Sequence, residues 1–119
     1  MWKTIELTNP VHLSELIEDE RYIMVSLDKN SWPKTRRLIT MRTKYADPNY
    51  RFLDVDDVHN IIGNPDIYCF KNYLWNITSF AFYRMNPLPE RTVPSLNSIS
   101  KYQLTTEEFH VLRNNFMLP

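Results

Sequence analysis

Asp54, Asp56 and Asp57 form a cluster of carboxylates in the middle of the chain, and His59 follows them. Carboxylates two or three residues apart can share a divalent cation, and a histidine beside an aspartate can act as a general base. An EF-hand calcium loop is excluded, because Pro65 stands where its bidentate glutamate should be. Acidic residues also favour the start of a helix. We interpret the cluster as a helix start and keep a hydrolase or nuclease built on Asp56, Asp57 and His59 as an alternative.

Other signals of catalysis are missing from the sequence. Cys69 is the single cysteine, so no intramolecular disulfide can form and a cysteine-based zinc site lacks its ligands. It lies within an apolar run, where we expect a core side chain and not a nucleophile. Gly63 is the single glycine, which excludes a glycine-rich phosphate loop. We therefore predict a protein that is not an enzyme and that has no catalytic residues, no metal site and no cofactor.

Chemistry suited to binding is concentrated in one basic segment. The chain has 14 basic and 14 acidic residues, yet residues 34–51 hold six basic residues against one acidic residue, a local charge of +5. If residues 35–44 form a strand, the cations at even-numbered positions project to one face, with aromatic residues on the adjoining loops. The predicted binding residues are Trp32, Lys34, Arg36, Arg42, Lys44, Tyr50 and Arg51.

Three interpretations of this basic segment remain open. Tyr, Trp and Arg are the residue types that dominate protein interfaces, which favours a protein partner. Cations beside aromatic rings also suit a nucleic acid, through phosphate contacts and base stacking, although dedicated binders more often carry a net positive charge. The third interpretation is a solvated face whose cations pair with acidic residues of the chain.

The proline-rich residues 86–97 suit partner recognition or an ordinary crossover.

The elements that must position these residues follow from the periodicity of apolar side chains. Alternation predicts strands, capping patterns predict helices, and the pair Thr105 and Glu108 has the spacing of a capping box. We expect strands at 2–7, 22–28, 35–45, 67–70 and 75–83, with a turn near Lys71-Asn72 and a short strand at 100–104, and helices at 10–20, 54–62 and after Thr105.

These elements predict one domain over residues 1–119 of the α+β class. We expect a curved, mainly antiparallel sheet of about five strands with two or three helices packed on one face, because short connections between strands favour hairpins. The single cysteine favours a reducing compartment, and the N-terminal residues lack the continuous apolar run of a signal peptide. A soluble cytoplasmic protein that does not contact a membrane is the expectation.

The composition adds one association. With 1 glycine and 7 tyrosines in 119 residues, and with many asparagines, the chain resembles in composition the orphan proteins of bacteriophages. That resemblance implies a small inhibitor that docks onto a host complex in the host cytoplasm. Our leading hypothesis is a non-enzymatic protein that binds a protein partner, and the alternative is a nucleic-acid-binding domain that uses residues 34–51.

Overall fold

The computed structural model describes residues 4–28, 36–56, 58, 70–85 and 104–116. Its centre is a five-stranded sheet in the order β4-β3-β2-β1-β5, in which every neighbouring pair is antiparallel. The predicted antiparallel sheet and the α+β class are therefore confirmed. The strands are β1 (Arg21–Ser26), β2 (Arg37–Lys44), β3 (Tyr50–Asp56), β4 (Phe70–Asn76) and β5 (Phe80–Arg84).

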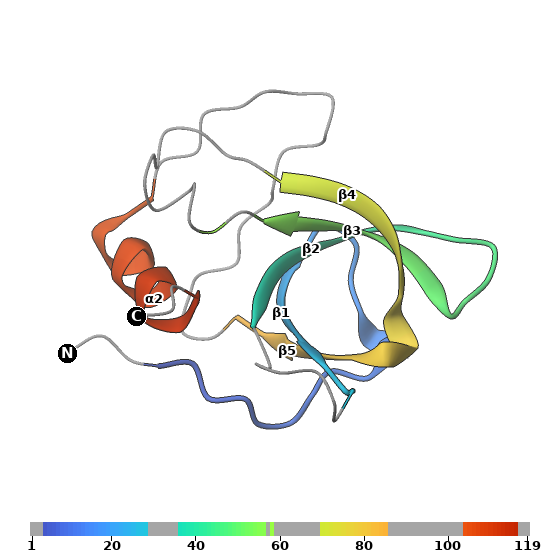
Figure 1. Ribbon diagram of the computed structural model, residues 1–119, viewed down its shortest axis with the longest axis horizontal. Helices are drawn as coiled ribbons and strands as arrows, with labels where there is room; N and C mark the ends of the chain where they lie inside the picture. The colour runs from blue at the N-terminus through green and yellow to red at the C-terminus, as the bar shows by residue number, and fades with distance from the viewer. Residues whose placement is uncertain (1–3, 29–35, 57, 59–69, 86–103, 117–119) are drawn as a thin grey trace.

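The sheet curls until its two outer strands meet at a corner (Figure 1). There a 3-10 turn, η2 (Ile77–Ser79), carries the chain directly from β4 to β5. The side chain of Asn76 begins the turn by accepting hydrogen bonds from the backbone N–H and the hydroxyl of Thr78, at 3.1 and 2.5 Å. Strands β1 to β4 thus form a meander, and β5 closes it by pairing with β1.

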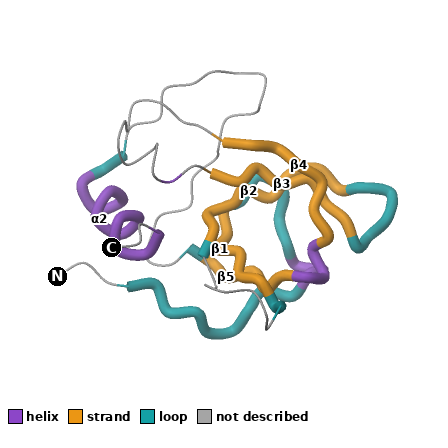
Figure 2. Tube along the Cα trace, viewed as in Figure 1, coloured by secondary structure: helices purple, strands orange, loops and turns teal. Residues whose placement is uncertain are grey.

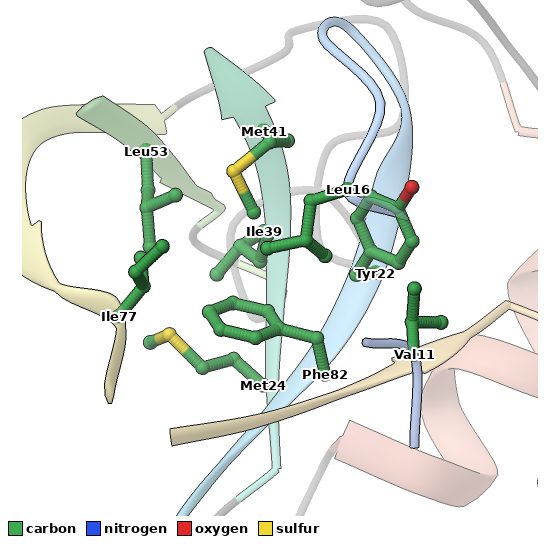
Figure 3. Close-up of a cluster of buried hydrophobic side chains, with 9 residues drawn as sticks. All are labelled: Val11, Leu16, Tyr22, Met24, Ile39, Met41, Leu53, Ile77 and Phe82. Carbon is green, nitrogen blue, oxygen red and sulfur yellow. The ribbon is translucent and has the colours of Figure 1, made fainter. Parts of the chain in front are cut away.

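Alternating side chains of the strands fill two separate cores, because successive residues of a strand face opposite sides of the sheet. Tyr22 and Met24 point into the curl, whereas Ile23 between them belongs to the outer core. Figure 3 shows the inner cluster converging around Phe82. The inner core contains Val11, Leu16, Tyr22, Met24, Ile39, Met41, Leu53, Ile77 and Phe82. The outer core contains Ile5, Ile23, Leu38, Val58, Met85, Val111, Leu112 and Phe116.

The C-terminal helix α2 (Thr106–Phe116) supplies much of the outer core. It begins at the predicted capping box, where the backbone N–H of Glu108 donates to Thr105 Oγ1 at 3.1 Å. The carboxylate of Glu108 in turn accepts from the backbone N–H of Thr105 at 3.2 Å. The sequence prediction of this helix is confirmed.

The predicted helix at 10–20 is wrong. Most of this segment is loop (Figure 2), with a single 3-10 turn, η1 (Leu13–Glu15). Two of its backbone amides donate to the sheet, from Val11 N–H to Phe82 O at 2.7 Å and from Asp19 N–H to Met41 O at 2.7 Å. Asp19 also has a positive φ of 69°, which a right-handed helix does not allow.

The predicted first strand, residues 2–7, is not a strand over its described part, residues 4–7. The amide and carbonyl of Ile5 are occupied by side chains, since Asn115 Oδ1 accepts from the amide and Arg36 donates to the carbonyl. The fifth strand of the sheet is instead β3. The predicted turn at Lys71-Asn72 is also wrong, because these residues lie within β4.

The two or three predicted helices are not shown by the described part of the chain. Asp54 and Asp56, expected to begin a helix over 54–62, are residues of β3, and Asp54 pairs in register with Thr40 of β2. Of the described residues, those of α2 form an α-helix and Val58, inside the predicted range 54–62, is also helical; residues 57 and 59–62 of that prediction lie outside the described residues. Gly63, Cys69, the proline-rich residues 86–97 and residues 100–103 of the predicted short strand lie outside the described residues. No helix in the part of the chain that the structure describes is long and apolar enough to cross a membrane.

Candidate binding site

Two of the predicted binding arginines hold the fold together. Arg36 donates from Nη1 to the carbonyl of Ile5 at 2.8 Å and to Asn115 Oδ1 at 3.0 Å. Its hydrogen bonds thereby join the N-terminal segment, the start of β2 and helix α2. Trp32 and Lys34, also predicted as binding residues, lie outside the described residues.

Arg42 forms ion pairs with two aspartates. Its Nε lies 2.5 Å from Asp54 Oδ2 and its Nη1 lies 2.6 Å from Asp19 Oδ1. Asp54 is fully buried and also accepts a hydrogen bond from Asn72 at 2.7 Å. Burial acts to lower the pKa of Arg42, but the hydrogen bonds to Asp54 and Asp19 outweigh it and raise this pKa. The charge of Arg42 is therefore balanced within the molecule.

The other three predicted residues, Lys44, Tyr50 and Arg51, line one pocket of about 350 Å³. Four segments of the chain contribute to it: the η1 segment, the end of β2 with the loop that follows, the start of β3, and η2. The lining residues are Leu13, Ser14, Leu16, Lys44, Tyr45, Pro48, Tyr50, Arg51 and Ile77.

Sequence reasoning missed the apolar part of this lining. Leu13 and Leu16 were placed on a helix face, and Ile77 was placed within a strand. Tyr45 and Pro48 carried a signal that went unused, because an aromatic residue and a proline in a short loop beside a basic strand are typical of recognition surfaces. Leu13, Leu16 and Ile77 reach the pocket only through the tertiary fold, so no local pattern in the sequence marks them.

Backbone hydrogen bonds hold the loop between β2 and β3 in place. Asp47 begins a turn in which its carboxylate accepts from the backbone N–H of Asn49 at 2.9 Å and its carbonyl accepts from that of Tyr50 at 3.0 Å. The carbonyl of Asn49 accepts from the backbone N–H of Ile77 at 2.9 Å, which ties the loop to η2. The pocket wall formed by this loop is thus fixed in the free protein.

The aromatic side chains of the pocket are partly open to solvent. Tyr45 is 48% exposed and packs edge-on against Phe52, with ring centroids 6.0 Å apart. Tyr50 and Leu13 are each 37% exposed. Large apolar side chains that stay exposed around a concave site are a common mark of a binding surface.

Two cations line the pocket in different settings. Lys44 is exposed, whereas Arg51 is only 5% exposed. Arg51 donates from Nε to the carbonyl of Arg42 at 2.9 Å and from Nη1 to that of Leu16 at 3.2 Å. Burial lowers the pKa of Arg51, although the charge of Glu18 acts in the opposite direction.

The carboxylate cluster considered for catalysis is not assembled within the described residues. Asp54 is paired with Arg42, and Asp56 is buried on β3. Asp57 and His59 lie outside the described residues. Over the ranges that the structure describes, no group of three His, Cys, Asp or Glu side chains is placed to hold a metal ion.

No protein-family model, no curated protein and no solved structure matches this chain.

Proposed function

We propose that this chain is a non-enzymatic binding protein that docks a protein partner at the pocket between η1, the β2–β3 loop and η2. The observation that carries the proposal is a preformed concave site whose rim exposes Leu13, Tyr45 and Tyr50. Tyrosine gives a large contact area for little loss of side-chain entropy, and it is among the residues that dominate binding energy at interfaces.

The rigidity of the site supports the same function. Because the Asp47 turn and the hydrogen bond from Ile77 to Asn49 hold the loop in the free protein, less ordering entropy is lost on binding. Lys44 adds an exposed positive charge that attracts an acidic partner. The compositional resemblance to phage orphan proteins favours a host complex as the partner and inhibition in the host cytoplasm as the outcome.

Capture of the partner from a lysate of the source cells, followed by binding measurements with the purified partner, tests this function. The double variant Tyr45→Ala/Tyr50→Ala should bind at least about tenfold more weakly. Tyr73→Ala is the matched control, because Tyr73 is 55% exposed but does not line the pocket. Equal binding by the double variant and the wild type would refute the proposed function.

The second candidate function is binding of single-stranded nucleic acid at the same pocket. It is favoured by the presence of Lys44 beside Tyr45 and Tyr50, a combination that can contact a phosphate and stack bases. The balanced charge of Arg42 weighs against it, because this arginine is engaged by two aspartates. Binding of an oligothymidine that weakens steeply between 50 and 200 mM salt, as expected for phosphate contacts, would establish this candidate.

A further inference from the structure

Arg51 is a buried cation that has no acidic partner among the residues that the structure describes. Its hydrogen bonds go to two backbone carbonyls, those of Arg42 and Leu16. Glu18 is exposed, and its negative charge acts to raise the pKa of Arg51. No ion pair within 4.0 Å joins the two side chains. Buried charges in proteins are normally paired. An arginine in this position is therefore suited to bind an anion from outside the chain.

The guanidinium of Arg51 has N–H donors that are not used by the two backbone carbonyls. An arginine carries five N–H donors in a planar fork, and the two backbone carbonyls accept from Nε and Nη1. The other donors of Arg51 have no acceptor within the described ranges, and the side chain lines the pocket. Such a fork matches the two oxygens of a carboxylate, and the low exposure of Arg51 strengthens a charge-assisted hydrogen bond.

We propose that Arg51 and the apolar wall of this pocket capture the C-terminal carboxylate of the partner polypeptide. This inference rests on the proposed function and names the part of the partner that enters the pocket. Arg51 pairs with the carboxylate, the last side chain packs against Leu13, Leu16 and Ile77, and the preceding residues cross Tyr45 and Tyr50.

A chain end fits the lining better than an internal acidic side chain. A C-terminal residue presents a carboxylate and an apolar side chain from a single Cα, which matches one cation beside Leu16 and Ile77. An aspartate or glutamate side chain supplies the carboxylate but leaves the apolar wall uncovered. The volume, about 350 Å³, lies at the low end of the roughly 300–1,000 Å³ typical of ligand sites, as expected for a chain end.

A single buried arginine also argues against a phosphorylated peptide. A phosphate monoester carries close to two charges and is recognised by clusters of arginines. Here Arg42 is already paired with Asp19 and Asp54, and Arg36 is bound to Ile5 and Asn115. The pocket thus offers one buried guanidinium, with the exposed Lys44 beside it, and not the arginine cluster that binds a phosphate, which favours a monoanion.

The test uses the wild-type protein and three N-acetylated tetrapeptides, followed by backbone amide chemical shifts. The first peptide is three alanines and a leucine with a free C-terminal carboxylate, and the second is its C-terminal amide. The third is the amide with an aspartate before the leucine. The free acid should bind at least about tenfold more tightly than either amide. Its largest shifts should fall on Leu13, Tyr45 and Arg51.

Two variants connect the preference for the free acid to Arg51. Arg51→Gln should abolish this preference, whereas Arg84→Gln, which removes an exposed cation outside the pocket, should keep it. If Arg51→Gln does not fold, the comparison of the three peptides on the wild type still decides the question.

Equal binding of acid and amide, equal binding of the aspartate amide, or stronger binding of a thymidine tetranucleotide overturns the inference. These results leave the proposed function standing if Tyr45→Ala/Tyr50→Ala still weakens binding of the captured partner.

Discussion

Arginines that look equivalent in the sequence have different roles in the structure. Arg42 and Arg51 lie nine positions apart in the same basic segment, yet Arg42 pairs with two aspartates and Arg51 binds backbone carbonyls beside the pocket. Local charge counts identify the segment but not the partner of each cation, because the partners come from distant parts of the chain. The surface charge available for binding is therefore smaller than the local +5 indicates.

The ion pairs of Arg42 allow a prediction from two matched substitutions. Asp54→Asn should lower the free energy of unfolding by about 3 kcal/mol, because it leaves a largely buried guanidinium without its buried partner. Asp19→Asn should cost less than about 1 kcal/mol, since the side chain of Asp19 is 53% exposed. Urea denaturation of both variants measures the difference. Equal losses would show that burial does not govern the strength of these pairs.

Tyr22 predicts how stability changes at alkaline pH. Burial, followed by the hydrogen bond to Glu20 and its charge, raises the pKa of the Tyr22 hydroxyl above 10.0, although the hydrogen bond from the amide of Ile17 acts against this. Because the folded pKa is raised, the associated stability is fully present below pH 10 and is lost as the pH rises through the folded pKa.

Tyr22→Phe isolates this contribution. The variant should lose about 1 kcal/mol at pH 8 through its missing hydrogen bonds. The difference from the wild type should shrink above about pH 10, where the unfolded wild type gains stability by ionising. Urea denaturation from pH 8 to 11 measures both curves. A constant difference over that range would contradict a raised pKa.

At the scale of elements, sequence patterns succeeded where the local chain decides the conformation. The helix after Thr105 was predicted because its cap is local, and β1 and β2 were predicted from strict alternation. Strand β3 was missed because Asp54 and Asp56 are poor strand residues, and the burial of Asp54 depends on its tertiary partners Arg42 and Asn72.

In the segment before β1, the sequence predicted a helix where the structure has mostly loop. Leu13, Leu16 and Ile17 have helical spacing, but in the structure Leu16 is buried and Ile17 is 49% exposed. Hydrogen bonds from Val11 and Asp19 to the sheet replace those of a helix. The apolar half of the pocket depends on this conformation, which is why the predicted binding residues include Lys44, Tyr50 and Arg51 of the pocket lining but not Leu13 or Leu16.

The capping box of α2 can be tested directly. Thr105→Ala should lower the free energy of unfolding by about 1 kcal/mol, because the backbone N–H of Glu108 loses its acceptor. Thr106→Ala is the matched control and should change stability by less than about 0.5 kcal/mol, since it replaces an exposed side chain within the first turn. Thermal unfolding followed by circular dichroism compares them, and equal effects would contradict a capping role.

At the scale of the whole molecule, the pocket and the outer core lie at different parts of the curled sheet. The pocket is formed by loops and turns around η2, whereas α2 and the N-terminal segment pack on the outer core. Asn115 joins both chain ends to the sheet, because its Oδ1 accepts from Ile5 N–H at 2.8 Å and from Arg36 Nη1 at 3.0 Å. Contacts between residues about 110 positions apart are thus part of the fold.

Loss of Asn115 should therefore destabilise the packing of the N-terminal segment on the outer core and leave the pocket unchanged. Asn115→Ala should lower the free energy of unfolding by about 2 kcal/mol and accelerate hydrogen exchange at the amide of Ile5, which loses its acceptor. Arg113→Ala, an exposed residue on the same helix, should leave that exchange rate unchanged. Amide exchange followed by NMR compares Ile5 with Ile77, whose hydrogen bond to Asn49 lies at the pocket. Faster exchange at both amides would mean that the outer core and the pocket open as a single unit. It would contradict the prediction that loss of Asn115 leaves the pocket unchanged.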